Sequence, residues 1–247
     1  MNQRLEGHIA RRYDDELNHV HTSVIELGGL VLDQLTKTLE ALSEREVSAA
    51  LRVLERDESV KQLEKRLDDE IVRVIARRAP VAKDLRSVIG MAKAVADLGH
   101  VERECVNVAQ MALAFFDHGM YPPPNNMMRD IYSMGRTAAS HLRTGLEVFD
   151  ICDLERAIET VALRQELSQE FQCCLRRLST FLMEDARNVG QVVNVVLSTR
   201  SLERVGEYAL NLCEYVIYQV TGEEPENHFT QNAARGSEPA RGSEAGG

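Results

Sequence analysis

The chain has no tryptophan, and aromatic residues make up only 5% of its 247 positions. Proline is also scarce, with 6 residues. Sheets are enriched in aromatic and β-branched residues, whereas the leucine, alanine, glutamate and arginine that are plentiful here favour helices. The composition therefore predicts an all-helical protein.

Long apolar runs are missing as well. Nowhere do 18 apolar residues occur together, so no segment is expected to span a membrane. Residues 1–20 also have no apolar run of signal-peptide length. We therefore expect a cytoplasmic protein without membrane insertion.

The cysteine and charge content excludes further classes. The five cysteines are odd in number and include no Cys-x-x-Cys pair, which argues against a disulfide framework or a zinc knuckle. The adjacent pair Cys173 and Cys174 is predicted to be core packing. The formal net charge is −10, and non-specific nucleic-acid binding needs a basic face. We expect no nucleic-acid partner.

Patterns typical of enzymes are not found. The sequence has no Gly-x-x-x-x-Gly-Lys-Ser/Thr loop to hold a nucleotide phosphate, and its seven histidines are scattered. We therefore expect no catalytic residue, no enzymatic activity and no required cofactor.

The chain does contain long amphipathic segments. Apolar residues spaced by three and four predict a helix over 14–44, and five later segments have the same kind of pattern. Three consecutive prolines cannot continue a helix, so a linker is predicted around them. The expected helices are 14–44, 46–79, 80–116, 127–149, 153–185 and 186–220. The expected organisation is an N-terminal arm (1–13), a first three-helix repeat (14–117), the proline-rich linker (118–126), a second three-helix repeat (127–221) and a disordered tail (222–247).

The two halves match each other when one is shifted along the chain. A shift of 107 residues places Gly28 on Gly135 and Leu39 on Leu146, and a shift of 104 aligns the third helices. Three helix pairs in the same order indicate an internal duplication. The sequence thus predicts an all-α fold of two tandem pseudo-symmetric three-helix bundles with six long helices. Because glycine is unfavourable inside a helix, Gly28 and Gly29 predict that a neighbouring helix passes close to them.

A polar stripe runs along the last helix. Its members are separated by three or four residues and so share one face: Arg200, Glu203, Glu207, Asn211 and Glu214. Like charges one turn apart, as at Glu203 and Glu207, destabilise a helix unless a cation lies between them. A bound metal ion or a neighbouring arginine would supply that cation. The alternative is a solvated stripe with Arg200 and Arg204 as the partners.

Several of these segments resemble the PhoU family, regulators of phosphate uptake in bacteria. The resemblance rests on Ser-Leu-Glu-Arg-Val-Gly-Glu and Asn-Leu-Cys-Glu within 201–214, on Pro-Val-Ala-x-Asp-Leu-Arg at 80–86, and on Met-Glu-Asp at 183–185. It covers about residues 14–224. It also implies two three-helix repeats, in agreement with the duplication.

In some PhoU-family members, acidic pairs on the third helix of each repeat hold clusters of metal ions. The second repeat keeps this pair as Glu203 and Glu207, whereas Gly99 and Arg103 occupy the matching positions of the first. Arg164 replaces the acidic residue of the second helix in the second repeat, where it could act as an internal cation. We expect at most one weakly bound divalent metal ion, held mainly by Glu203 and Glu207.

The resemblance implies a negative regulator of phosphate uptake and phosphate-starvation signalling. The implied partners are the ATPase subunit of a phosphate ABC transporter and a sensor histidine kinase, and the long helical faces favour a homodimer. Asp84 and Arg86 could cap a helix or contact a partner. Two alternatives remain open. One is a metal-binding bundle, which would need Glu-x-x-His pairs on facing helices, and no such pair is expected in this chain; the other is a structural helical scaffold.

Overall fold

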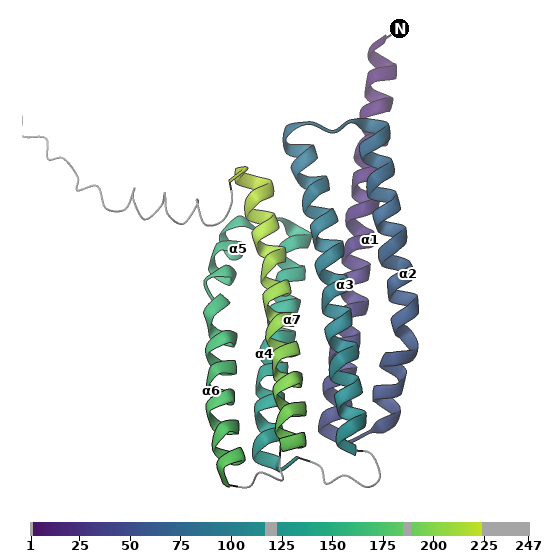
Figure 1. Ribbon diagram of the computed structural model, residues 1–247. Helices are drawn as coiled ribbons and strands as arrows, with labels where there is room; N and C mark the ends of the chain where they lie inside the picture. The colour runs from purple at the N-terminus through teal and green to yellow at the C-terminus, as the bar shows by residue number, and fades with distance from the viewer. Residues whose placement is uncertain (1, 117–122, 185–188, 224–247) are drawn as a thin grey trace, which may run out of the picture.

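The chain forms long helices joined by short connections. The computed structural model describes residues 2–116, 123–184 and 189–223, and within these ranges every regular element is a helix (Figure 1). The predicted all-α class is confirmed. The helices are α1 (Asn2–Glu44), α2 (Val47–Arg78), α3 (Ala82–Phe116), α4 (Asn125–Ile151), α5 (Leu154–Val161), α6 (Arg164–Glu184) and α7 (Val189–Thr221).

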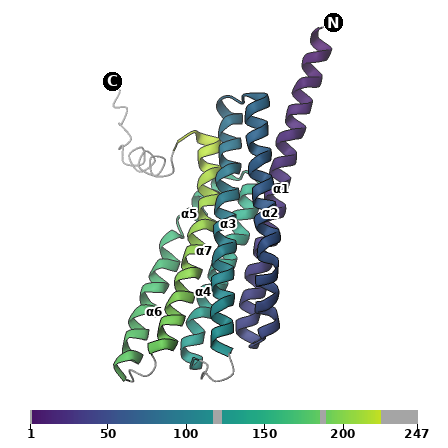
Figure 2. The ribbon, with the colours of Figure 1, turned by 45° about the vertical axis from the view of Figure 1, so that its right-hand side comes forward.

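These helices form two bundles that lie side by side. Helices α1 to α3 make the first bundle and α4 to α7 the second, with α2 and α6 on opposite outer flanks (Figure 1). The bundles meet where α3 packs against α7 and where α1 packs against α4. In the view turned by 45° the first turns of α1 extend past the ends of α2 and α3 (Figure 2).

Two glycines show how the bundles are related. A Cβ atom on Gly28 would lie 2.2 Å from Cδ2 of Leu146, and one on Gly135 would lie 2.3 Å from Cδ2 of Leu39. Both pairs connect antiparallel α1 and α4, and a shift of 107 residues exchanges their roles. The contact therefore occurs twice about a pseudo-twofold axis, which confirms the duplication. It also confirms the close approach predicted at Gly28, whereas Gly29 is exposed with nothing within 4 Å of its Cβ position.

The apolar stripe predicted for the first helix forms a large part of the core. Its members Leu17 and Leu39 are half-buried, and the other six are at most 3% exposed: Val20, Val24, Leu27, Val31, Leu35 and Leu42. Spacing by three and four thus identified the buried face of α1 correctly. Among the helices that the structure describes, none is both long and apolar enough to cross a membrane.

Several predicted boundaries differ from the structure. Helix α1 begins at Asn2, so residues 2–13 of the expected arm are part of this helix. Helix α3 begins at Ala82 and not at Pro80, after Ala79 ends α2 in the left-handed conformation (φ 46°). Helix α4 begins at Asn125, inside the expected linker 118–126. Most of the expected tail, residues 224–247, lies outside the described residues.

The fifth expected helix, 153–185, is divided into α5 and α6. Asp153 caps α5 by accepting a hydrogen bond from the backbone N–H of Arg156 (3.1 Å). The chain then turns at residues 162–163, where the N–H of Leu163 donates to the carbonyl of Thr160 (3.1 Å). Neither residue in the turn is glycine or proline, so the usual sequence signals of a helix end are missing there.

Candidate functional site

The two carboxylates predicted to share a cation lie in different environments. The side chain of Glu203 is buried, with 2% exposure, and forms an ion pair with Arg200. The guanidinium group of Arg200 also lies over the ring of Phe171, 5.5 Å from its centroid. Glu207, one turn further along α7, is exposed. Arg200 therefore supplies a positive charge next to Glu203. A neighbouring arginine was one of the two cations that the sequence suggested here, the other being a metal ion.

The first repeat has replaced the carboxylates of its third helix with a different arrangement. The carboxylate of Glu64, from α2, lies over Gly99, where a Cβ atom would be 2.2 Å from its Oε1. Arg103 lies 3.6 Å from Oε2 of Glu64, and its other nitrogen is 2.9 Å from Nδ1 of His100. The guanidinium group of Arg103 thus lies where a metal cluster would need a further carboxylate. These residues do not fit a multinuclear metal centre.

A polar cleft of about 330 Å³ opens between α2, α3 and α7. Arg204 lies in its wall and pairs with Glu104 across the boundary between the repeats (Nη1 to Oε1, 2.8 Å). The same guanidinium donates to the hydroxyl of Tyr208 (2.8 Å), and Asn107 donates to the second oxygen of Glu104 (3.2 Å). Because the side chain of Glu104 is 5% exposed, this pair is a fixed structural link between the bundles.

Arg164 takes a partner different from the one expected. It donates to Oδ1 of Asn211 (3.2 Å) and pairs with Oε1 of Glu214 (2.5 Å). Arg164 therefore joins α6 to the end of the α7 stripe, two turns beyond Glu207. It thus acts as a cation within the second repeat, but its ion pair is with Glu214, and its side chain is 38% exposed.

Asp84 and Arg86 lie near the ends of two helices. Asp84 is in the first turn of α3, where a negative charge is favoured by the helix dipole. Nε of Arg86 donates to the carbonyl of Gln219 near the end of α7 (3.4 Å), where a positive charge is favoured. Arg86 thus ties the start of α3 to the end of α7. This geometry favours the structural interpretation of Arg86, and its contact with a partner stays a prediction.

A buried polar pair in the first bundle was missed from the sequence. Gln34 of α1 donates from Nε2 to Oε1 of Glu102 on α3 (3.1 Å) and to the carbonyl of Val53 on α2 (3.2 Å). Oε2 of Glu102 is buried without a hydrogen-bond partner. Burial raises the pKa of Glu102 to about 7, with a further increase from Asp57, while the bond from Gln34 opposes the shift. A signal was present, because Glu102 lies in the apolar stripe four residues after Leu98.

A second missed carboxylate connects the repeats. Asp97 of α3 is 8% exposed and accepts hydrogen bonds from the hydroxyl of Tyr215 (2.5 Å) and from Nδ2 of Asn211 (3.0 Å), both on α7. Burial, and then the bond to Asp97, raise the pKa of Tyr215. Asn211, expected on a solvated stripe, is therefore part of the contact between the bundles.

Cysteine packing follows the prediction at one of the two adjacent positions. Cys174 is fully buried, and burial raises the pKa of its thiol to about 11, so it is protonated at neutral pH. Cys173 is half-buried, and its Sγ accepts a hydrogen bond from Nη2 of Arg176 (3.0 Å).

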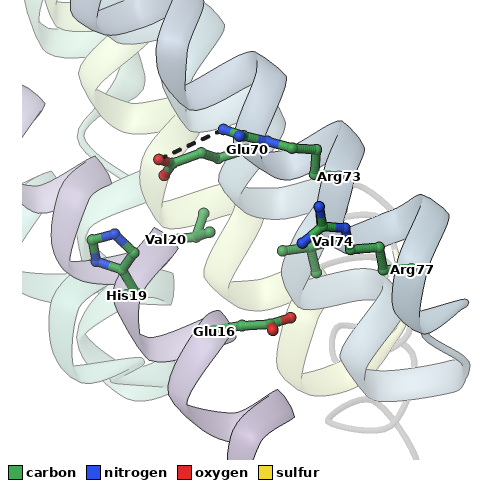
Figure 3. Close-up of a pocket in the computed structure, with 7 residues that line it drawn as sticks. All are labelled: Glu16, His19, Val20, Glu70, Arg73, Val74 and Arg77. Carbon is green, nitrogen blue, oxygen red and sulfur yellow. Dashed lines mark ion pairs between the residues drawn. The ribbon is translucent and has the colours of Figure 1, made fainter.

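A smaller cleft of about 190 Å³ lies between α1 and α2 (Figure 3). Glu16 and His19 line it and form a Glu-x-x-His pair of the kind that a metal-binding bundle uses, so the expectation that the chain has no such pair is wrong. However, both carboxylate oxygens of Glu16 accept hydrogen bonds from Arg78 (2.9 and 2.6 Å), and the nearby Glu70 pairs with Arg73 (3.8 Å). Across the described part of the chain, no three His, Cys, Asp or Glu side chains are placed to hold a metal ion.

These observations give a prediction for metal content. With Glu203 already paired and Glu207 exposed, we expect protein purified without chelator to contain at most one weakly held divalent ion per chain, because a hard cation needs more oxygen ligands. Elemental analysis measures this directly. Two or more equivalents of iron or zinc, lost in the Glu203→Ala, Glu207→Ala double variant, would contradict the prediction.

Comparison with known proteins agrees with the internal duplication. A family model described as PhoU domain matches the chain twice, at residues 24–112 and 131–216. The two matches begin 107 residues apart and end 104 residues apart, the same shifts that align the two halves of the sequence. The repeat unit of the fold is therefore the family's domain.

Individual relatives match over most of their length. The chain is 34% identical to a phosphate-specific transport system accessory protein PhoU homolog of Pseudomonas putida, over 89% of this chain and 85% of the relative. It is 31% identical to the phosphate-specific transport system accessory protein PhoU of Escherichia coli, over 89% of this chain and 90% of the relative.

Solved structures show the same fold. The crystal structure of PhoU from Pseudomonas aeruginosa superposes with a TM-score of 0.80 at 33% identity, covering 85% of this chain and all of that one. The structure of the phosphate transport system regulatory protein PhoU from Streptococcus pneumoniae has a TM-score of 0.76 at 24% identity, covering 86% and 98% of the two chains. Because the family's domain matches the chain twice and the solved structures of the family share its fold, the chain belongs to the PhoU family.

Proposed function

We propose that this protein is a negative regulator of phosphate uptake and of phosphate-starvation signalling. It acts in the cytoplasm, as a homodimer and without catalysis, as an adaptor between the ATPase subunit of a phosphate ABC transporter and a sensor histidine kinase. When phosphate is plentiful, its helical faces hold the kinase in the inactive state. The names of the relatives, accessory proteins of phosphate-specific transport, support the role in phosphate transport.

The adaptor mechanism is supported mainly by an exposed apolar stripe at the start of α7. Val189, Val193 and Leu197 are spaced by four residues and are 54%, 48% and 50% exposed. Next to the end of α6, Met183 is 89% exposed. Large apolar side chains gathered on one helical face are typical of protein contact sites. The buried carboxylate of the same helix, Glu203, is in contrast already paired within the chain.

Binding measurements test this proposal. Biolayer interferometry with the purified ATPase subunit and the cytoplasmic part of the kinase is expected to show that both bind the wild-type protein. The Val193→Asp, Leu197→Asp double variant should bind at least one of them about tenfold more weakly, since it places charge in an apolar contact. Val72→Asp is the matched control, because Val72 is 63% exposed on the outer helix α2. If neither partner binds the wild-type protein, the adaptor mechanism is wrong.

A further inference from the structure

Helix α4 has three arginines on one face that are absent from the equivalent helix of the first repeat. Arg129, Arg136 and Arg143 are seven residues apart, so successive side chains lie about 10 Å apart along the helix and drift by only about 20° per step. All three are exposed. We call them the α4 arginine stripe.

The arginine stripe has no partner within the part of the chain that the structure describes. None of its members forms an ion pair or hydrogen bond with another described residue, although most other arginines do. The chain as a whole has a net charge of −10. Three guanidinium groups without an ion pair among the described residues form a local positive surface that can attract an acidic partner.

The pseudo-twofold symmetry allows the residues of α4 to be compared with those at equivalent positions of α1. A shift of 107 residues relates the arginine stripe to Thr22, Gly29 and Thr36 on α1, and all three of these positions are also exposed. Because the helices have the same packing role in each bundle, the fold does not require arginine at these positions. The difference between the repeats therefore indicates a function of the second repeat alone.

A groove of about 570 Å³ lies beside the arginine stripe, between α4 and α1. Arg136 and Arg143 line its α4 side, Glu40 lines its α1 side, and Leu39 and Ala139 contribute apolar surface. Tyr132 is held in place by a hydrogen bond from its hydroxyl to the carbonyl of Leu42 on α1 (2.9 Å). The site thus combines apolar surface with two arginines two helical turns apart and a single glutamate, so its positive charges outnumber its negative one.

We propose that the arginine stripe and this groove dock an acidic amphipathic helix of a partner protein. Such a helix places apolar side chains in the groove, and acidic residues seven apart on the same face meet Arg136 and Arg143. A nucleic acid lacks side chains for the apolar surface, and a flat anionic membrane cannot enter a groove. The proposal deepens the function proposed above, because it specifies the chemistry of one partner segment.

A designed peptide tests the docking directly. The probe is a fluorescein-labelled, alanine-rich helix of about 18 residues, with two glutamates seven residues apart and leucines between them on the same face. Fluorescence anisotropy is expected to show binding to the wild-type protein and an affinity at least about tenfold lower for the Arg136→Glu, Arg143→Glu variant. A peptide with lysines in place of the glutamates should show the opposite preference.

The matched control is Arg66→Glu, Arg73→Glu on α2, which has the same charge change and the same seven-residue spacing on exposed positions. It should bind the glutamate peptide within about twofold of the wild type. Circular dichroism melting confirms that both variants fold. Equal binding by the two variants, or no binding by the wild type, would overturn the docking site. Binding of a DNA duplex or of anionic phospholipid vesicles that depends on Arg136 and Arg143, without peptide binding, would overturn it as well.

The two proposals fail in different ways. In one outcome, the kinase and the ATPase subunit bind the wild-type protein and the Arg136→Glu, Arg143→Glu variant equally, and binding of the peptide does not depend on the two arginines. The docking inference then fails and the adaptor function stands. If the peptide binds through the arginines but neither partner binds the wild-type protein, the docking site stands and the adaptor function fails.

Discussion

Replacing Glu102 by glutamine is expected to stabilise the protein at pH 8 by roughly 1–3 kcal/mol, with a much smaller gain at pH 5. The reason is the buried position of this carboxyl group, which has one oxygen bonded to Gln34 and the other without a partner. Glutamine keeps the shape and can accept the same hydrogen bond, but it cannot ionise. It therefore removes the cost of a buried charge.

The dependence on pH follows from the pKa of Glu102, which is raised from 4.5 to about 7 in the folded protein. Between these two values the unfolded chain loses its proton while the folded chain keeps it. The unfolded state then binds fewer protons, so stability falls as the pH rises through this interval and levels off above pH 7. Below pH 4.5 the carboxyl is protonated in both states and its contribution disappears.

Urea unfolding of the wild type and of Glu102→Gln at pH 5 and pH 8 measures this difference. Glu207→Gln is the control, because it makes the same chemical change at an exposed position of α7. It should change stability by less than about 0.5 kcal/mol at either pH. A Glu102→Gln variant that is destabilised equally at both pH values would show that the folded protein needs the ionised carboxylate.

Replacing Gly145 by alanine is expected to destabilise the protein by roughly 1–3 kcal/mol. A Cβ atom on Gly145 would lie 2.4 Å from the backbone carbonyl oxygen of Ala209, so α4 and α7 would have to move apart. A backbone atom of a packed helix cannot move out of the way, whereas a side chain can do so by changing its rotamer. The first repeat has Thr38 at the matching position, fully buried, so α1 leaves room there for a side chain.

Replacing Gly29 by alanine should change the stability of the protein in the opposite direction. No atom lies within 4 Å of its Cβ position, and the residue is exposed within α1. Alanine there is expected to stabilise the helix by about 0.5–1 kcal/mol, because glycine is the poorer helix former. Thermal unfolding measures both variants, with a shift of about 2–4 °C per kcal/mol for a chain of this size. Equal shifts for both would contradict the close approach of α4 and α7.

The sequence predicts the arrangement of helices well because apolar spacing and duplication determine it. The stripe from Val20 to Leu42 is buried, and the shift of 107 residues recurs in the contacts of Gly28 and Gly135. The turn between α5 and α6 was not predictable in the same way, since Ala162 and Leu163 are ordinary helix residues. The extension of α1 to Asn2 was not predicted, because the apolar stripe on which the predicted helix rests begins only after Asp14.

The site was predicted less completely, because spacing places a residue on a helical face but does not identify what that face meets. Glu203 and Glu207 share one helix, yet one is buried against Arg200 and the other is exposed. Arg164 was expected as an internal cation, but it is partly exposed and pairs with Glu214, a contact that depends on how α6 packs on α7. Gln34 and Glu102 meet only through the packing of α1 on α3.

Activity of a phosphate-starvation reporter such as alkaline phosphatase, in a deletion strain grown in phosphate-rich medium, tests the regulatory function most directly. We expect high reporter activity in the deletion strain and low activity once the wild-type protein is restored. The Val193→Asp, Leu197→Asp variant should fail to restore repression, whereas the Val72→Asp control should succeed. Reporter activity in the deletion strain that stays as low as in the parent strain would contradict the proposal that this protein represses phosphate-starvation signalling.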